Sequence, residues 1–377
     1  MRITKVFRQK PKTGILMLNM GGPSTLPEVK PFLSRLFNDR DLLKLPFNQE
    51  LMAKFITERR YRMIEKHYDE IGGGSPIGKW TGLQGDKMVE LLDEMNPESA
   101  PHKYYIGFRY AAPLTENAIS QIERDQPEHV VAFTQYPQYS CATTGSSLNH
   151  IARLYGEMGQ KPSSTWSVID RWPVWEGLID AFAECTIAGL NQIPEEDRHK
   201  AVILFSAHSL PLSAVERGDP YPHEVAATVY AVMQKLGFRN PWRVTWQSQV
   251  GPKKWLSPKT DEVLEEFSKR GRKSLVIVPI AFTSDHIETL HELDIEFAEE
   301  AEKAGLKHYI RAPALNDNST FCQSLADRVQ HHLNVEIPRG ESFNAQLGLR
   351  CPKCTNPSCQ EMRNFFNERK RMLYASK

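Results

Sequence analysis

The chain lacks a clear excess of either charge and lacks any long hydrophobic run. Its 377 residues include 47 lysines and arginines against 46 aspartates and glutamates, which gives a formal net charge of +1. A nucleic-acid-binding protein normally has a strong basic excess, so we expect no nucleic-acid partner. The longest apolar stretches, such as 275–282, fall far short of the roughly 18–20 residues that span a bilayer. We therefore expect a soluble or peripheral protein.

The N-terminal end lacks the apolar segment of a secretory signal. The segment 1–12 is instead rich in lysine and arginine. Two interpretations remain open for this basic segment, the remnant of an organellar transit peptide and an ordinary basic terminus.

Cysteine is scarce, and half of the six cysteines stand close together near the C-terminus. Cys351, Cys354 and Cys359 form a C-x2-C-x4-C cluster. In a chain of this size without a secretory signal, such a cluster indicates a metal site rather than a disulfide framework. Three thiolates at this spacing suit zinc or an iron–sulfur cluster, and the pattern does not decide between them. The candidates for the fourth ligand are a histidine and the remaining cysteines, Cys141, Cys185 and Cys322.

Short apolar runs alternate with helical patterns along the chain, which is typical of parallel sheets in α/β proteins. The sequence therefore predicts two similar doubly wound α/β domains, each with a four-stranded parallel sheet flanked by helices. We expect the N-terminal domain over 13–185, the C-terminal domain over 186–344 and a cysteine-bearing C-terminal extension over 345–377. The eight expected strands are 14–18, 104–108, 130–134, 166–170, 202–205, 243–246, 275–280 and 309–311.

The first two expected strands are separated by a long insertion, which covers about 23–75. It carries apolar residues, including Leu36 and Leu42, flanked by arginines and lysines. An apolar ridge with flanking cations is what contact with a membrane surface requires. We interpret 32–55 as a lip that contacts a membrane, and an ordinary amphipathic helix pair packed on the domain is the alternative.

Polar or metal-competent side chains follow several of the expected strands. In an open α/β sheet, ligands bind outside the carboxyl ends of the strands, so these side chains should meet in one cleft. His208 follows the strand 202–205. An imidazole of near-neutral pKa can accept protons or bind a metal. A purely structural histidine is the alternative.

Three glutamates recur every four residues after the strand 275–280. Glu288, Glu292 and Glu296 therefore lie on one face if this segment is a regular helix. We interpret them as a track that conducts protons or cations toward His208. A solvated acidic helix face is the alternative.

Two further groups of residues suit an apolar ligand that carries carboxylates. Aromatic side chains near strand ends or in proline-rich loops are interpreted as the wall of a flat pocket, while the glycine-rich loop 72–76 offers backbone and side-chain donors for carboxylates. The loop matches neither nucleotide-binding fingerprint. The wall residues are Tyr110, Tyr136, Tyr221, Trp255 and Phe282, and the donors near the loop are Arg59, Arg60 and Tyr68.

These segments together resemble the motifs of the ferrochelatase family. The resemblance covers about 13–366, and the run IAFTSDHIETL at 280–290 is highly specific to that family. The other matching segments are LNMGGP at 18–23, GFRY at 107–110, FTQYPQYSC at 133–141, FSAHSLP at 205–211 and RGDPYP at 217–222.

The resemblance implies insertion of ferrous iron into protoporphyrin IX, the last step of haem synthesis, with the porphyrin between the two domains. It implies that His208 accepts the pyrrole protons beside Glu288 and His286, and that Glu292 and Glu296 form the track that leads away. Fe2+ is then a substrate. The substrate-binding residues that the resemblance implies are Met20, Leu36, Leu42, Arg60, Tyr68, Ser75, Arg109, Tyr110, Tyr136, Tyr221, Trp255 and Phe282.

Two positions need separate comment. Asp327 matches an acidic position of the family and is grouped with the catalytic residues on that likeness alone. Where many relatives have two histidines, this chain has Trp175 and the acidic Glu176 in the run RWPVWE. No imidazole acts at that point of this chain.

The C-terminal cysteines resemble the [2Fe–2S] site of animal-type ferrochelatases, which implies the ligands Cys141, Cys351, Cys354 and Cys359. The resemblance also implies a homodimer on the matrix side of the mitochondrial inner membrane, with the lip in peripheral contact with the bilayer. One alternative is a non-catalytic porphyrin or haem carrier with a redox-sensing iron–sulfur cluster. Another is a zinc-stapled α/β protein without porphyrin chemistry.

Overall fold

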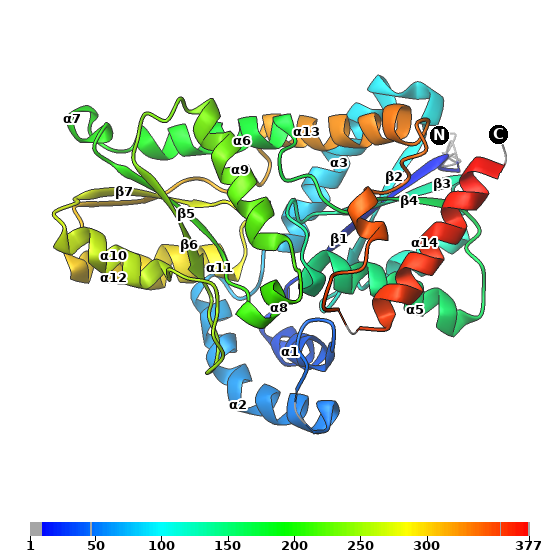
Figure 1. Cartoon of the computed structure of the whole chain (residues 1–377), viewed down its shortest axis with the longest axis horizontal. Helices are drawn as coiled ribbons and strands as arrows, with labels where there is room; N and C mark the ends of the chain where they lie inside the picture. The colour runs from blue at the N-terminus through cyan, green and yellow to red at the C-terminus, as the bar shows by residue number, and fades with distance from the viewer. Residues whose placement is uncertain (1–9, 46, 355, 376–377) are drawn as a thin grey trace, which may run out of the picture.

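The computed structural model describes residues 10–45, 47–354 and 356–375, and two four-stranded parallel sheets form its framework (Figure 1). The N-terminal sheet has the order β2-β1-β3-β4, and the C-terminal sheet has the order β6-β5-β7-β8. The strands are β1 (Thr13–Asn19), β2 (His102–Phe108), β3 (His129–Thr134), β4 (Thr165–Ile169), β5 (Val202–His208), β6 (Trp242–Gln247), β7 (Ser274–Pro279) and β8 (His308–Arg311).

All eight predicted strands and the predicted fold class are confirmed. Most strand ends differ from the prediction by one or two residues, but β5 runs three residues further and ends at His208 itself. Ser206 and Ala207 interrupt the apolar run in the sequence, yet both are buried and both pair in register with β6. His208 therefore sits at the carboxyl end of a central strand.

Helices cover the sheets, whose central strands are buried on both faces. Every residue of β1 and of β7 is buried, as expected for strands between two helical layers. The helices are α1 (Val29–Asn38), α2 (Gln49–Glu70), α3 (Ile77–Met95), α4 (Thr115–Asp125), α5 (Ser146–Met158), α6 (Glu176–Leu190), α7 (Glu195–Arg198), α8 (Leu212–Glu216), α9 (Tyr221–Lys235), α10 (Thr260–Lys269), α11 (Ile287–Leu290), α12 (Phe297–Ala304), α13 (Ser319–His331) and α14 (Ser358–Ala375).

One hydrophobic core continues from the N-terminal sheet into the C-terminal sheet. Met17 and Phe133 of the first sheet belong to the same buried cluster as Phe205 and Val276 of the second. Helix α13 packs on both α3 and α6, so it bridges the two halves (Figure 1). The predicted boundary between 185 and 186 falls inside α6 rather than in a linker. The division into two domains remains a prediction.

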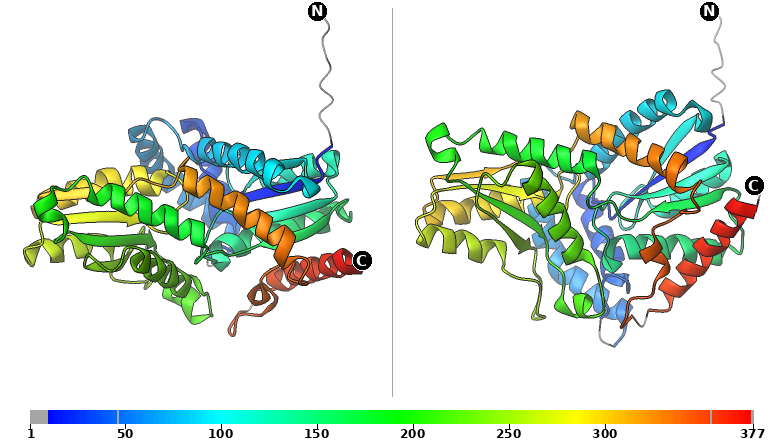
Figure 2. Two further views of the ribbon diagram at one scale, coloured as in Figure 1. Left: turned by 90° about the horizontal axis from the view of Figure 1, so that it is seen from above. Right: turned by 45° about the horizontal axis from the view of Figure 1, so that its top comes forward.

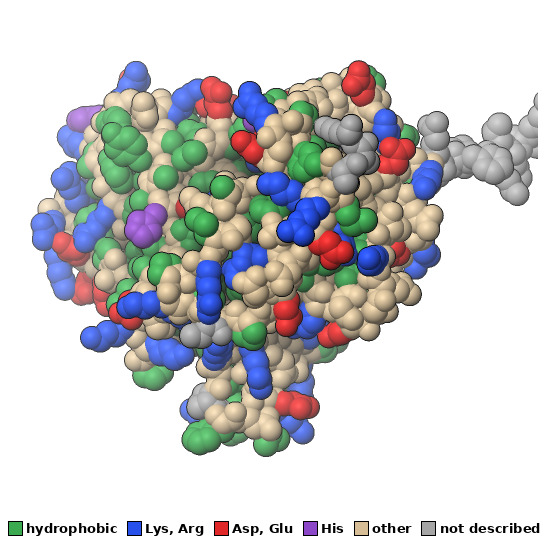
Figure 3. Space-filling model, turned by 45° about the vertical axis from the view of Figure 1, so that its right-hand side comes forward, with side chains coloured by type: hydrophobic (Ala, Val, Ile, Leu, Met, Phe, Trp, Pro, Cys, Tyr) green, Lys and Arg blue, Asp and Glu red, His purple; other side chains and the backbone are tan. Residues whose placement is uncertain are grey.

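The insertion forms α1 and α2, which project from the sheets at the bottom of Figure 1. The two helices pack on each other around a small core of their own. Phe47, Leu51 and Phe55 stay outside this core, with 98%, 66% and 61% of their surfaces exposed. Figure 3 shows hydrophobic and basic side chains on this projection. Among the described residues, no helix has both the length and the apolar character needed to cross a membrane.

The C-terminal extension packs on the N-terminal sheet. It contains a short turn, η6 (Ala345–Gly348), and then α14, which lies along α5 and β4 (Figure 2). Met362 and Phe366 of α14 are buried in the core of that sheet. Residues 1–9 of the basic segment predicted at 1–12 lie outside the described residues.

Candidate active site

His208 is half-buried and has one ring nitrogen engaged. Its Nδ1 lies 2.7 Å from the carbonyl oxygen of Ser209. Because a carbonyl oxygen only accepts hydrogen bonds, Nδ1 carries the proton and donates it. Nε2 of the neutral ring then keeps a free lone pair, and no described residue hydrogen-bonds to it. The backbone thus holds His208 in the tautomer that a proton acceptor needs.

Glu292 lies close enough to His208 for their charges to interact. Its carboxylate accepts hydrogen bonds from the Ser248 amide at 2.7 Å, from Gln247 Nε2 at 2.9 Å and from the Ser248 hydroxyl. Burial raises the pKa of Glu292 overall, and the charge of Glu288 adds to the rise, although the hydrogen bonds and His208 act in the opposite direction. Glu292 therefore exchanges a proton closer to neutral pH than an ordinary glutamate does.

The segment that carries Glu288, Glu292 and Glu296 is not the regular α-helix that the sequence predicted. Helix α11 ends at Leu290, and a π-helix, η4 (Glu292–Glu296), follows it. A π-turn has i→i+5 hydrogen bonds in place of the i→i+4 bonds of an α-helix, so the backbone here is wider than in a regular helix. Glu292 turns toward β6, whereas Glu296 is exposed and lies beside His291.

His286 and Phe282 adjoin Glu288. His286 Nε2 is 3.2 Å from Glu288 Oε2, and the His286 ring centroid is 4.5 Å from that of Phe282. The other ring nitrogen of His286 is buried without a hydrogen-bond partner. A buried polar atom without a partner is rare in proteins, so this atom is open to a ligand or a water molecule. Asp285 of the same motif is instead paired with Arg311 at 3.1 Å.

Side chains from the N-terminal half reach the same group. Burial is the main cause of the raised pKa of Tyr68 and of Tyr136, and the charge of Glu288 contributes to both. Both phenols therefore lie near Glu288, and Tyr136 also lies near the backbone of Met20. The structure thus brings residues that follow β1, β3, β5, β6 and β7 to one place.

Arg60 is a half-buried cation without a counter-charge. Burial lowers the pKa of Arg60, and among the described residues nothing pairs with its guanidinium. Arg60 and Tyr68 are eight residues apart on α2 and so lie on one face of it. Buried charges are normally paired, so Arg60 is suited to an anionic ligand.

Arg109 and Tyr110 belong to a buried network rather than to an open wall. Arg109 Nη2 and the Tyr110 hydroxyl donate to Asp39 Oδ2 at 2.8 and 2.7 Å, and the Ser146 hydroxyl donates to the same oxygen. Burial alone would raise the pKa of Asp39, but Arg109, Ser146 and Tyr110 lower it overall. Because Asp39 follows α1, this network anchors the lip to the N-terminal sheet.

Comparison with known proteins gives a consistent result. The family model described as Ferrochelatase matches residues 12–333. Curated relatives are named "Ferrochelatase, mitochondrial". The Bos taurus relative is 57% identical over 359 residues, which cover 95% of this chain and 85% of the relative. The Homo sapiens relative is 56% identical over 360 residues, which cover 95% of this chain and 84% of the relative. The Schizosaccharomyces pombe relative of that name is 48% identical over 366 residues, with 97% and 85% covered.

This chain belongs to the ferrochelatase family. The solved structure of SirB from Bacillus subtilis with Fe3+ is similar with a TM-score of 0.50 and 14% identity, covering 85% of this chain and 95% of that one. At that identity the likeness shows the fold alone.

Two residues predicted for the ferrochelatase site lie elsewhere. Asp327 is on α13, where it accepts a hydrogen bond from Gln323 and lines a surface hollow with Trp175. The structure does not bring Asp327 to His208, so its grouping with the catalytic residues is corrected. Tyr221 is 8% exposed and packs on Trp246 in the shared core, instead of on an open pocket wall.

Four other residues predicted to bind the substrate are partly accessible, but their contacts in the structure do not indicate a ligand. Trp255 is half-buried, and its indole N–H donates to the Val250 carbonyl at 3.1 Å. The Ser75 hydroxyl accepts from the backbone amide of Ile77 at the start of α3. Leu36 and Leu42 are partly buried against the small core of the lip. They remain predicted substrate contacts.

The structure brings Cys141 to the C-terminal cysteines. Cys141 and Cys351 interact directly, and Cys354 and Cys359 form a second pair. The interaction with Cys141 is the main cause of the lowered pKa of Cys351. The other two cysteines, Cys185 and Cys322, are buried in the protein and are not candidates for the fourth ligand.

Sequence reasoning missed several residues of this region. Gln247 ends β6 and Ser248 follows it, so the strand-end rule could have found both. Asp39 and Arg109 are 70 residues apart, and no local pattern predicts their contact. His67 and His291 were also missed.

Proposed function

We propose that this chain, a member of the ferrochelatase family, inserts ferrous iron into protoporphyrin IX with Nε2 of His208 as the acceptor of the pyrrole protons. One observation carries the proposal. The Ser209 carbonyl holds the proton on Nδ1, which leaves Nε2 free, and the charge of His208 interacts with Glu292, which in turn interacts with Glu288. The reaction is inferred from family membership, and the proton acceptor is inferred from the contacts of His208.

The protons need a way out of the site. Metallation removes a proton from each of two pyrrole nitrogens as Fe2+ enters the ring. His208 takes the two protons one after the other on Nε2 and passes each to a nearby carboxylate, for which Glu292 is suited because burial raises its pKa. Glu288 interacts with Glu292, and the exposed Glu296 ends the path at solvent. Glu292 is half-buried and Glu296 is exposed, so the carboxylates of this path lie in different environments.

Binding the porphyrin involves apolar contact and anion recognition. Met20, Tyr136 and Phe282 adjoin the His208 and Glu288 group and are suited to contact the ring. We infer that a propionate pairs with Arg60, because this half-buried cation lacks a partner among the described residues. A site that favours a bent ring over a flat one directs the nitrogen lone pairs at the metal and lowers the barrier.

The arrangement of the four cysteines favours a [2Fe–2S] cluster over zinc. In a zinc site with four thiolate ligands every sulfur lies about 2.3 Å from one ion, so all sulfurs are about 3.8 Å apart. Here Cys141 interacts with Cys351 and Cys354 with Cys359, and no three of these described sulfurs lie within 4.8 Å of one another, which suits two irons with two thiolates each. When bound, the cluster supplies a redox-active group between the extension and the N-terminal sheet. Visible absorption by the purified protein supports the cluster, and its absence supports zinc.

We also infer a mitochondrial location, since the curated relatives are named mitochondrial. Within the mitochondrion, we propose peripheral contact with the matrix side of the inner membrane. Phe47, Leu51 and Phe55 are exposed on the lip, and the exposed cations Lys44 and Lys54 flank them. The homodimer is proposed from the family likeness alone.

A metallation assay tests the proposal. Purified protein is mixed with protoporphyrin and Fe2+ without oxygen, and loss of porphyrin fluorescence is followed. We expect His208→Ala to lower the rate by about 10²–10⁴-fold with an unchanged circular dichroism spectrum. His199→Ala, which removes an exposed histidine, is the matched control and should keep full activity. Full activity in His208→Ala would contradict the assigned acceptor, and no metallation by the wild-type protein would contradict the function.

A further inference from the structure

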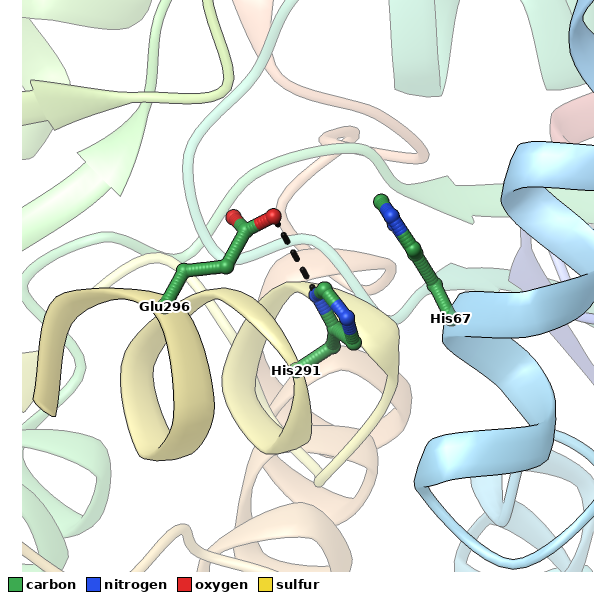
Figure 4. A group of neighbouring side chains, drawn as sticks. All are labelled: His67, His291 and Glu296. Atoms are coloured by element: carbon green, nitrogen blue, oxygen red, sulfur yellow. Dashed lines mark ion pairs between the residues drawn. The ribbon is translucent and has the colours of Figure 1, made fainter. Parts of the chain in front are cut away.

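A second group of metal-competent side chains lies where the C-terminal end of α2 meets the C-terminal half of the chain. His67 projects from α2, and His291 and Glu296 come from the segment around η4 (Figure 4). Their ligand atoms all lie within 4.8 Å of one another. Within the described part of the chain, this is the one group of three or more such residues that meets this criterion. The two histidines have no part in the reaction proposed above.

His291 is held between two carboxylates. Its Nε2 lies 2.8 Å from Glu70 Oε2. Its Nδ1 lies 3.5 Å from Glu296 Oε1, the ion pair that the dashed line marks in Figure 4. Because a carboxylate only accepts hydrogen bonds, Nε2 carries the ring proton and donates a hydrogen bond to Glu70. In the neutral ring, Nδ1 then directs a lone pair at the oxygen of Glu296, and two lone pairs repel each other. A cation between them, either a second proton or a metal ion, removes the repulsion.

His67 supplies a further ligand atom to the same place. Its ring is stacked on that of His291, with centroids 3.9 Å apart and planes inclined by 13°. Burial, followed by the charge of His291, lowers the pKa of His67, which favours the neutral form that can bind a metal. A second proton on His291 would leave the lone pair of His67 unused, whereas a metal ion would use it.

We propose that His67, His291 and Glu296 form an auxiliary site for a divalent transition metal of the Zn2+ and Fe2+ class. Imidazole nitrogen and carboxylate oxygen are suitable ligands for these ions. Glu70 accepts a hydrogen bond from Nε2 of His291. A metal-binding histidine is usually oriented by such a hydrogen bond from its other ring nitrogen to a carboxylate. Glu296 is exposed, so water completes the coordination.

Metal binding at this site requires a limited movement of His67. Ligand distances of about 2.0–2.1 Å put neighbouring ligand atoms about 3.3 Å apart, closer than the present spread. The two rings are nearly parallel, so their in-plane lone pairs do not yet converge. Rotation about the side-chain torsions of the half-buried His67 brings its nitrogen toward His291 and Glu296.

A metal ion here joins α2 to the C-terminal half of the chain. His67 precedes Tyr68 on α2, while His291 follows α11, which carries Glu288. Tyr68 and Glu288 already interact across this gap. An occupied auxiliary site therefore fixes the separation of two walls of the active site. This inference does not depend on the proposed function.

Zinc binding to the full-length protein tests the site. The cysteine site is first loaded with its own metal, and His208→Ala serves as the parent so that the insertion site binds zinc less well. Equilibrium dialysis against Zn2+ should show about one equivalent per chain that His67→Gln removes and His199→Gln, the exposed control, retains. Zinc should also raise the thermal unfolding midpoint of the parent more than that of His67→Gln.

The location is checked by anomalous scattering at the zinc edge from soaked crystals, where we expect a peak between His67 and His291. Equal zinc uptake by the parent and His67→Gln overturns the inference, and so does a peak that appears only at crystal soaking concentrations with no uptake in solution. If wild-type protein fails to metallate porphyrin while the zinc result holds, the proposed function fails and the auxiliary site stands.

Discussion

Replacement of Asp39 by asparagine removes one buried negative charge and changes little else in shape. Asp39 Oδ2 accepts hydrogen bonds from Arg109 at 2.8 Å and from the Tyr110 hydroxyl at 2.7 Å. The side chains of the ion pair are only 8% and 3% exposed, so water cannot replace the lost charge. Loss of one partner from a buried ion pair costs about 3–5 kcal/mol. We expect the free energy of unfolding of Asp39→Asn to fall by about that amount at pH 7.

The loss should depend on pH in a defined direction. The pKa of Asp39 in the folded protein lies below its ordinary value of 3.8, so its stabilising effect is complete above that value and is lost as the pH falls through the lowered pKa. The difference between wild type and Asp39→Asn should therefore shrink in acid.

Urea unfolding, followed by circular dichroism at neutral and acidic pH, measures both effects. Asp197→Asn is the matched control, because this substitution removes an exposed ion pair with Lys307 and should change stability little. Equal urea midpoints for wild type and Asp39→Asn at pH 7 would refute the reasoning, because Arg109 would then be stable without its partner.

Three further predictions concern activity, membrane contact and acid stability. Glu288→Gln should lower the metallation rate at least tenfold while porphyrin binding persists. A porphyrin carrier would not metallate porphyrin at all, and this substitution would leave its porphyrin binding unchanged. Replacement of Leu51 and Phe55 by serine should weaken liposome binding by about tenfold per residue, as judged by vesicle flotation, and unchanged flotation would make the lip an ordinary packed helix pair. Burial, followed by the charge of His332, lowers the pKa of His129 to about 3, so stability should fall by about 1.4 kcal/mol per pH unit as the pH drops below about 6.5. His129→Gln should show a shallower decline in acid titrations of stability, and an identical decline would contradict this reasoning.

The parallel sheets could be predicted because their signal is local. The strand β1 is seven residues long and buried throughout, so its apolar run is visible in the sequence. The carboxyl-end rule then pointed to His208 and to the segment after β7. The same rule applied to β6 would have added Gln247 and Ser248, which orient Glu292.

The remaining features depend on contacts or on backbone geometry that the sequence does not reveal. The π-helix at Glu292–Glu296 interrupts the expected regular helix without any proline or glycine to mark it. His67 and His291 come together only because α2 packs near η4. Asp39 follows α1, and its partner Arg109 follows β2. Such pairs become visible only when the chain is folded.

A crystal structure of the protein with bound protoporphyrin tests the central claim most directly. We predict that pyrrole nitrogens lie within hydrogen-bonding distance of His208 Nε2, with Glu288 on the same side of the ring and a propionate at Arg60. A porphyrin bound elsewhere, with His208 Nε2 turned away from every pyrrole nitrogen, would contradict the account.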